Sequence, residues 1–304
     1  MPIPYFHVVF TLPHALNALA QGNPRVLYSA LFRAAADTLL TFGREPRHLG
    51  GTIGVTAILH TWGQTLSQHL HLHCVVTGGA LAADGTHWIA AKDGFLFPVR
   101  ALSVVFRAKY LDALRQAFAA QTLTFASGTT ALNEPAAFAR FVAELRAAPW
   151  VVYAKRPFGG PAQVLKYLGR YTHRVAISNA RLITMHEGTV RFRWKDYADG
   201  DRTKVMALSA DEFLRRFLLH VVPHGFVRIR YFGLLANAQR RSHLDQCRAL
   251  LEAPALQTVP SIGPGEGPEV TPRPDAPRCP VCRVGAMHVT AVQPRPRVTR
   301  YDTS

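Results

Sequence analysis

Several features that would assign the protein to a familiar class are scarce in this sequence. Its 304 residues include only 4 cysteines, too few and too scattered for a disulfide framework. No apolar run reaches the roughly 18 residues that a membrane-spanning helix needs. The opening segment, MPIPYFHVVF, lacks the basic start and the small-residue cleavage site of a signal peptide. We therefore expect a protein of the reducing cytoplasm that has no membrane partner.

Acidic residues are also scarce. The chain carries 19 Asp and Glu against 35 Lys and Arg, a formal net charge of +16. Because 48% of the residues are hydrophobic and only 18% charged, the chain can bury a core, which excludes a disordered protein. The basic excess lies mainly in residues 151–250, with 18 basic and 7 acidic side chains. This bias favours a polyanionic partner, most commonly nucleic acid, bound by the middle third.

The order of the expected elements indicates the fold class. Strands are expected at 5–12, 51–61, 69–77, 150–156, 175–178, 181–187 and 190–197, and helices at 24–42, 102–125, 135–147, 159–174 and 209–221. Asp84-Gly85 predicts a turn before a further short strand, and Ser209 with Glu212 predicts a capping box. Strands and helices follow no strict alternation, so we expect an antiparallel α+β fold and not a doubly wound one.

The sequence changes character near its C-terminal end. Residues 1–252 are expected to form the folded domain, while 253–278 are rich in Pro and Gly without periodicity and predict a disordered linker. Residues 279–304 contain Cys279 and Cys282, which have the spacing of half a structural zinc site. A closed zinc site needs four ligands, and only Cys247 and His288 offer additions. We therefore expect the two cysteines to bind no zinc on their own, and Cys279 and Cys282 stay candidates for a structural zinc site that other ligands would complete.

One strand segment is unusually rich in imidazole. In Gln68–Val76, QHLHLHCVV, three histidines alternate with apolar residues. Alternate side chains share one face of a strand, so Leu70 and Leu72 should enter the core while His69, His71 and His73 face the other way. Neighbouring histidines on that face are about 6.5 Å apart, a separation that two imidazoles can close around a metal ion. The alternative is a solvated strand face, although Lys or Thr would serve that purpose equally well.

Two tyrosines are spaced for one face of a helix. In VLKYLGRYTHR, Tyr167 and Tyr171 stand at i and i+4, about 6 Å apart. Val164 lies on the same stripe, so core packing of both rings is the alternative. Against that alternative, three basic residues of the kind that contact phosphate crowd the same turn: Lys166, Arg170 and Arg174. An activated phenol is also a competent nucleophile.

Further basic residues are candidates for following a nucleic-acid backbone. Arg191 and Arg193 alternate with Phe192 and Trp194 along one strand, and Arg228 and Arg230 follow later in the chain. In addition, Trp194 or Tyr197 could stack on unpaired bases. Together, histidines, tyrosines and a basic surface fit one chemistry, which is cleavage of a DNA phosphodiester through a covalent phosphotyrosine assisted by a metal ion.

These residues occur in motifs that resemble those of a known family, the insertion sequence 91 transposases of the HUH (His-hydrophobic-His) endonuclease superfamily. The resemblance covers residues 2–252 and rests on PYFHVVFTLPH, HLHLHCVVTGGAL, YLGRYTHRVAISN, FRWKDY, DEFLRRFLLHVVPHGFVRIRYFGLLAN and CPVC. It implies an antiparallel sheet flanked by helices, with the histidine strand at its centre. It assigns metal binding to His71 and His73, and nucleophilic attack to Tyr167 and Tyr171.

The resemblance also implies an activity. Members carry out rolling-circle-type transposition on single-stranded DNA, at transposon ends and target, with Mg²⁺ or Mn²⁺ and a 5′-phosphotyrosine intermediate. We accordingly expect a bacterial, nucleoid-associated enzyme that could act as a homo-oligomer. The alternatives are a non-catalytic DNA-binding remnant of a transposase and a replication-initiator-like nickase.

Two points depart from the family pattern or stay open. Family members usually begin with a cysteine-rich zinc-binding domain, whereas this sequence begins at the catalytic region. The third metal ligand is not fixed by the motif, and Gln64, His60 and His69 are all within reach.

Overall fold

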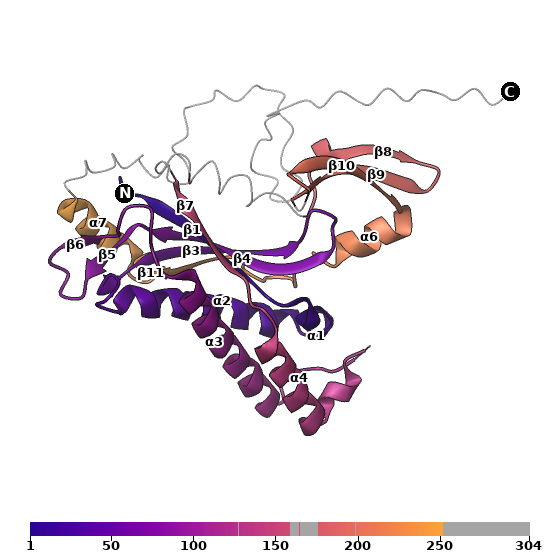
Figure 1. Ribbon diagram of the computed structural model, residues 1–304, viewed down its shortest axis with the longest axis horizontal. Coiled ribbons are helices and arrows are strands. Elements are labelled where there is room, and N and C mark those ends of the chain that lie inside the picture. The colour runs from indigo at the N-terminus through magenta and orange to yellow at the C-terminus, as the bar shows by residue number, and fades with distance from the viewer. Residues whose placement is uncertain (127, 159–163, 165–175, 198, 252–304) are drawn as a thin grey trace, which may run out of the picture. The chain divides into compact units, whose positions relative to one another are not determined.

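The computed structural model describes residues 1–126, 128–158, 164, 176–197 and 199–251 (Figure 1). The chain divides after Pro254, and every described residue belongs to the first unit. The helix expected at 159–174, the linker at 253–278 and the tail with Cys279 and Cys282 lie outside the described residues, except for Val164.

A five-stranded antiparallel sheet forms the centre of the described unit. Its strand order is β11-β3-β4-β1-β7, so β4 is the middle strand. The strands are β1 (Tyr5–Thr11), β3 (Gly54–Trp62), β4 (Gln68–Thr77), β7 (Val152–Phe158) and β11 (Ile229–Gly233). All four pairings are antiparallel. The expected α+β class, and the central place of the histidine strand, are therefore confirmed.

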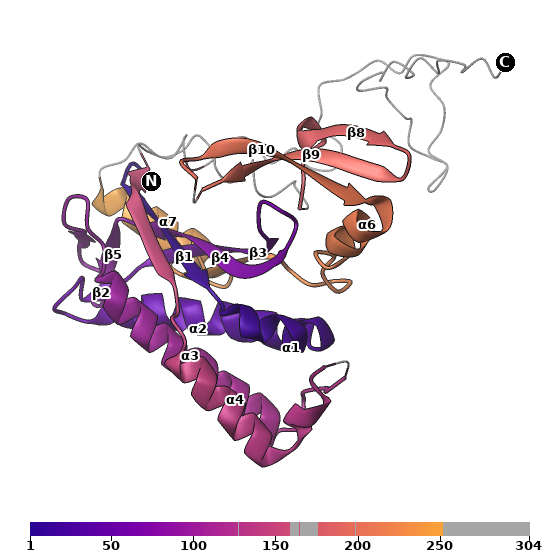
Figure 2. The ribbon, with the colours of Figure 1, turned by 45° about the vertical axis from the view of Figure 1, so that its right-hand side comes forward.

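One face of this sheet packs against helices. The long helices α2 (Pro24–Arg44) and α3 (Val99–Ala119) lie on the same side of the sheet in both views (Figures 1 and 2). Leu70, Leu72 and Cys74 of β4 are buried in the core formed there, as their alternation with histidine predicts. The remaining helices of this part are α1 (Asn17–Gly22) and α4 (Pro135–Ala147), with 3-10 turns η1 (His14–Leu16) and η2 (Thr130–Asn133).

The strand expected at 51–61 is divided in two. Gly51 and Thr52 form β2, which joins a small second sheet in the order β2-β5-β6 with β5 (Gly79–Ala82) and β6 (Trp88–Ala90). A Cβ atom on Gly51 would lie 2.3 Å from the carbonyl oxygen of Leu81, so only glycine allows this close approach of two strands. At the expected turn between β5 and β6, the Asp84 carboxylate accepts a hydrogen bond from the backbone N–H of Thr86 (3.0 Å).

A third sheet follows later in the chain, in the order β10-β9-β8. It contains β8 (Leu182–His186), β9 (Thr189–Asp196) and β10 (Arg202–Ser209), and α6 (Ala210–Leu218) begins directly after it. Phe192 is fully buried and packs with Phe213 and Phe217 of the helix. Ser209 caps α6 by accepting from Glu212 N (3.3 Å). Only this half of the predicted capping box is seen, because the Glu212 carboxylate accepts from Arg215 and Arg216 instead.

The structure also differs from the expected elements at residues 176–178 and at three elements that were not expected. Residues 176–178 were expected in a strand but form none, because Ala176 has a φ of 53° and turns the chain. The turn η3 (Asn179–Arg181) follows it. The sequence did not indicate β10, β11 or the last helix, α7 (Arg240–Leu250). Among the helices of the described residues, none is both long and apolar enough to cross a bilayer.

Candidate metal centre

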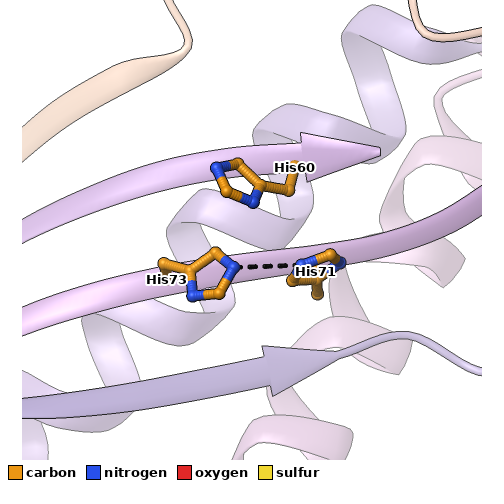
Figure 3. Close-up of side chains that lie close together, drawn as sticks. All are labelled: His60, His71 and His73. Carbon is orange, nitrogen blue, oxygen red and sulfur yellow. Dashed lines mark hydrogen bonds between the residues drawn. The ribbon is translucent and has the colours of Figure 1, made fainter. Parts of the chain in front are cut away.

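Three histidines converge on the face of the five-stranded sheet that is opposite the helices. His60 on β3 stands directly across from His71 on β4, and His73 follows two residues further along β4. One ring nitrogen from each histidine can be chosen so that the three atoms lie within 4.8 Å of one another (Figure 3). The register between β3 and β4 thus places His60 beside the two histidines that the motif indicated.

The other two candidates for a third ligand have different contacts. Gln64 lies in the turn between β3 and β4, where its amide donates to the hydroxyl of Tyr197 (3.1 Å) and accepts from the backbone N–H of Lys195 (3.4 Å). His69 pairs with His14, with 3.3 Å between Nδ1 and Nε2. Of the two histidines that the sequence left open, the structure groups His60, and not His69, with His71 and His73.

The three imidazoles are held in their neutral form. Burial is the main cause that lowers the pKa of His71 to about 4 and that of His60 to about 2. Burial likewise lowers the pKa of His73, and the neighbouring histidines lower it further. Only a neutral imidazole has the lone pair that a metal ion needs. All three side chains are therefore available as ligands near neutral pH.

Hydrogen bonds orient two of these rings. His71 Nδ1 lies 2.8 Å from the carbonyl oxygen of His69, and because a carbonyl only accepts, Nδ1 carries the proton and Nε2 the lone pair. His71 Nε2 in turn lies 3.1 Å from His73 Nε2. A partner on the second nitrogen is what fixes the tautomer and direction of metal-binding histidines.

His7 supplies the corresponding partner for His73, and the sequence did not single it out. His7 lies on β1, its Nε2 is 2.8 Å from His73 Nδ1, and the two rings stack with 5.0 Å between their centroids. Burial, followed by the charge of Lys155, lowers the pKa of His7 to about 4. A neutral His7 can accept the Nδ1–H of His73 when His73 Nε2 is used as a ligand. The visible signal was a lone histidine in an otherwise apolar strand.

The donor set bears on which ions would fit. The group contains three nitrogen donors, and no carboxylate of the described residues belongs to it. Imidazole suits the divalent transition metals, whereas Mg²⁺ prefers oxygen ligands and retains water. The triad can hold a divalent metal ion, and its nitrogen donors suit a transition metal better than Mg²⁺.

The turn between the two histidine-bearing strands, β3 and β4, is anchored to the third sheet and α6. Its three successive carbonyl oxygens, on Gln64, Thr65 and Leu66, accept hydrogen bonds from side chains outside the turn. The donors are Arg181 Nη2, Arg216 Nη1 (3.1 Å) and His220 Nε2 (3.0 Å), respectively. Leu66 has a φ of 60° and is fully buried beside Phe192. None of these three donors was predicted from the sequence.

The expected DNA contacts are spread over different surfaces. Arg191 and Arg193 are exposed on one face of β9, while Phe192 on the other face is buried, as their alternation predicted. Arg228 lies beside β3, where its carbonyl oxygen accepts from the backbone N–H of Leu59 (2.9 Å). From there its charge helps to lower the pKa of His60. Arg230 lies on the helix side of the sheet, with its guanidinium 4.4 Å from the ring centroid of Phe32. The structure does not bring Arg230 to the histidine face.

The remaining candidates fall outside the part of the chain that the structure describes. These are the two tyrosines, the basic residues beside them and the C-terminal cysteines: Tyr167, Tyr171, Lys166, Arg170, Arg174, Cys279 and Cys282.

The chain is similar to proteins named as transposases. Residues 54–243 match a family model described as Y2_Tnp, putative transposase. The chain is 56% identical over 287 residues to the putative transposase y4qJ of Sinorhizobium fredii (strain NBRC 101917 / NGR234), covering 93% of this chain and 72% of the relative. It is 28% identical over 296 residues to the transposase for insertion sequence element IS801 of Pseudomonas savastanoi pv. phaseolicola, covering 95% and 68%.

Solved structures resemble the chain only slightly. Metal-free and metal-bound structures of the conjugative relaxase TrwC in complex with oriT DNA align at 16% identity. Their TM-scores are 0.30 and 0.31, and the alignments cover 46% and 47% of this chain and 71% and 70% of the relaxase chains. A likeness this slight establishes no common fold.

Proposed function

Because the chain belongs to the Y2_Tnp family of putative transposases, we propose that it nicks single-stranded DNA and transfers the cut strand through a covalent 5′-phosphotyrosine. The observation that carries this proposal is the group of three neutral histidines, His60, His71 and His73, on the face of the central sheet opposite the helices. Burying and orienting three imidazoles lowers stability and would bring no benefit to a strand that only faces solvent. A metal-assisted reaction, in contrast, requires neutral imidazoles that are held in a fixed direction.

The histidines would hold Mg²⁺ or Mn²⁺. When bound, that cation would polarise the scissile phosphate and offset the charge that develops on it. The chain's own contribution is orientation, since the carbonyl of His69 and the ring of His7 direct the two ligands on β4. Lowered pKa values keep all three ligand imidazoles neutral at the working pH.

Tyr167 and Tyr171 are the proposed nucleophiles. The phenol oxygen of one attacks phosphorus in line, an O–P bond forms, and the bond from phosphorus to the 3′ oxygen breaks. The phenol loses one proton and the departing 3′ oxygen gains one, so no other reactant is consumed. The reverse attack by a 3′ hydroxyl rejoins DNA, and a second tyrosine allows a second cut before the first link is resolved.

Basic side chains would hold the DNA while this happens. We assign phosphate contacts to Lys166, Arg170, Arg174, Arg191, Arg193 and Arg228, consistent with a net charge of +16. Arg230 is left out because its guanidinium packs against Phe32 on the helix side of the sheet. The substrates would be the ends of a mobile element and its target, and the work would take place at the bacterial nucleoid.

The covalent link is the decisive test. Purified protein is incubated with labelled single-stranded DNA and Mn²⁺, and the products are separated on a denaturing gel. We expect a protein–DNA adduct that chelator abolishes and that Tyr167→Phe combined with Tyr171→Phe eliminates, with DNA binding retained. Tyr153→Phe, at an exposed tyrosine of β7, is the matched control and should form the adduct normally.

The same experiment separates the alternatives. An adduct that persists in the double variant would refute the tyrosine assignment, and mass spectrometry of the DNA-linked peptide would then identify the true nucleophile. Binding by the wild-type protein without any adduct would instead leave a non-catalytic DNA-binding remnant.

A further inference from the structure

We propose that one row of side chains on β9 is a track that guides single-stranded DNA to the histidine-bearing strands. The row consists of Arg191, Arg193 and Lys195 of β9 and of Tyr197, the residue that follows the strand, and we call it the β9 row. The proposal rests on the proposed function for the nature of the polymer, and it adds the surface that the polymer follows.

The β9 row lies on a single exposed face. Its members alternate in sequence, and all four are exposed. The residues between them point the other way, where Phe192 is buried and Trp194 packs beside it against α6. Side chains at alternate strand positions are about 6.5 Å apart, so the three cations stand at regular intervals, and the ring of Tyr197 follows just beyond the end of the strand.

Among the residues that the structure describes, the three cations of the β9 row have no acidic partner. Across the register from Arg191 and Arg193 stand the apolar residues Ala207 and Val205 of β10. A regular row of uncompensated cations on a flat sheet is complementary to a row of phosphates.

Cations elsewhere on the same sheet are treated differently. Lys204 of β10 lies 2.8 Å from both Asp196 and Asp199, and Arg202 lies 3.5 Å from Asp199. The acidic residues of this sheet therefore serve one group of cations and leave the β9 row unpaired. If the β9 row served only to keep the sheet soluble, nothing would favour placing the paired cations on β10 and the unpaired cations on β9.

Tyr197 ends the β9 row with an aromatic ring suited to stacking. The ring is 64% exposed, and its hydroxyl is held by the side-chain amide of Gln64 at 3.1 Å. Trp194, the other candidate for stacking, is partly buried in the cluster behind the sheet and has the Lys204 ammonium 5.9 Å from its ring centroid. The open ring of Tyr197 favours an unpaired base, and hence a single strand over a duplex.

The β9 row ends beside β3 and β4, the strands that carry the three histidines. Gln64 lies in the turn that joins β3 to β4, and His60 is four positions before it in the sequence. Arg181 strengthens this junction, since its guanidinium donates both to the carbonyl of Arg193 (2.7 Å) and to that of Gln64. DNA bound along β9 would therefore be led toward the histidine strands.

The first experiment measures binding without chemistry. Affinity for a fluorescein-labelled oligodeoxythymidine of roughly 20 nucleotides is followed by anisotropy, in chelator and over a range of salt. The test variant combines Arg191→Gln, Arg193→Gln and Lys195→Gln. The control combines Arg115→Gln, Arg140→Gln and Arg146→Gln, three exposed arginines of α3 and α4 that give the same change in net charge.

Neutralising three contacts should change both the affinity and the salt slope. We expect the test variant to bind about 100-fold more weakly near 0.1 M salt, with a log–log salt slope about 2 units shallower, because each single-strand phosphate contact contributes about 0.7. The control variant should keep most of the affinity. Equal behaviour of the two variants would overturn the proposal, as would equal competition by a duplex of the same length.

The second experiment isolates the ring of Tyr197. Tyr197→Leu removes the stacking surface and should weaken binding roughly ten-fold with no change in salt slope. Tyr197→Phe removes only the hydroxyl that meets Gln64 and should bind like the wild type. Loss of binding in both variants to the same extent would assign Tyr197 to anchoring the turn and refute its stacking role.

These outcomes are separate from those of the proposed nicking reaction. His71→Ala should bind the oligonucleotide normally in chelator, whereas the β9 variant should bind weakly yet keep its metal site. Failure to form any adduct would refute the proposed nicking reaction but would not contradict the proposal that the β9 row binds single-stranded DNA.

Discussion

The two faces of β4 compare two ways in which a sequence specifies structure. On one face Leu70, Leu72 and Cys74 are buried against helices, and any apolar side chains of similar volume would meet that need. On the other face His71 is buried and His69 and His73 are half-buried, and the hydrogen bonds of His71 and His73 are directed at particular neighbours. Burial of the apolar face stabilises the fold. Burial of polar rings on the histidine face, which we call the imidazole face, is unfavourable and is offset only in part by the hydrogen bonds that hold the rings in position.

The largest expected effects come from substituting two adjacent residues of β4, one on each face, and measuring both stability and Mn²⁺ binding. Leu72→Ala should lower the free energy of unfolding by about 2–5 kcal/mol, because it removes a fully buried side chain and leaves a cavity. The folded fraction of that variant should still bind Mn²⁺ like the wild type. His71→Ala should do the opposite and lose Mn²⁺ binding at a much smaller cost in stability.

Urea unfolding and calorimetric titration with Mn²⁺ measure the two quantities. The comparison would fail if His71→Ala destabilised the chelated protein as much as Leu72→Ala does, since the imidazole would then act as core.

How much the sequence predicted differs between these faces for a physical reason. Alternation is a local property, so it identified the apolar face of β4, and the polar character of the other face, without any tertiary contact. The third member of the histidine group depends on the register of β3 against β4, which places His60 opposite His71. Gln64 and His69 are just as near in the sequence, and no local pattern distinguishes them from His60.

Elements whose stability comes from distant partners were also missed. The strand β11 has only 5 residues, too few to show a clear alternation, and it is held by pairing with β3. The turn at Leu66 depends on Arg181, Arg216 and His220, which are more than 100 residues further along the chain. Propensity and periodicity do not contain such contacts, so they were found only in the folded structure.

The second effect tests the choice of His60 over its neighbour. His60→Ala should weaken Mn²⁺ binding by about 100-fold or more, since losing a ligand should exceed the 10–100-fold loss typical of an outer contact. His69→Ala is the matched variant, because His69 lies on the same face but pairs with His14. It should change the Mn²⁺ affinity little. Equal losses in the two variants would return the third ligand to an open question.

The pH dependence of stability gives a third, smaller effect. The pKa of His71 is about 4 in the folded protein and ordinary in the unfolded chain, so the unfolded chain takes up the proton first as the pH falls. Stability without metal should be constant above about pH 7 and fall between about pH 6.5 and 4, by up to about 1.4 kcal/mol per pH unit for each such histidine.

Urea unfolding in chelator at several pH values measures this slope. His71→Asn should make it shallower, whereas His186→Asn, at an exposed histidine of β8, should leave it unchanged. A wild-type slope in His71→Asn would show that the imidazole face carries no such penalty.

The smallest effect concerns His7, which touches the histidine group without belonging to it. His7→Phe keeps a buried ring against His73 but removes the nitrogen that lies 2.8 Å from His73 Nδ1. We expect Mn²⁺ affinity to fall about ten-fold, as for other contacts that orient a ligand, with little change in unfolding free energy. His7→Gln retains a hydrogen-bonding side chain and should recover part of the affinity. If the Phe and Gln variants bound Mn²⁺ equally well, the stacked ring alone would position His73, and the imidazole face would need fewer directed contacts than its geometry indicates.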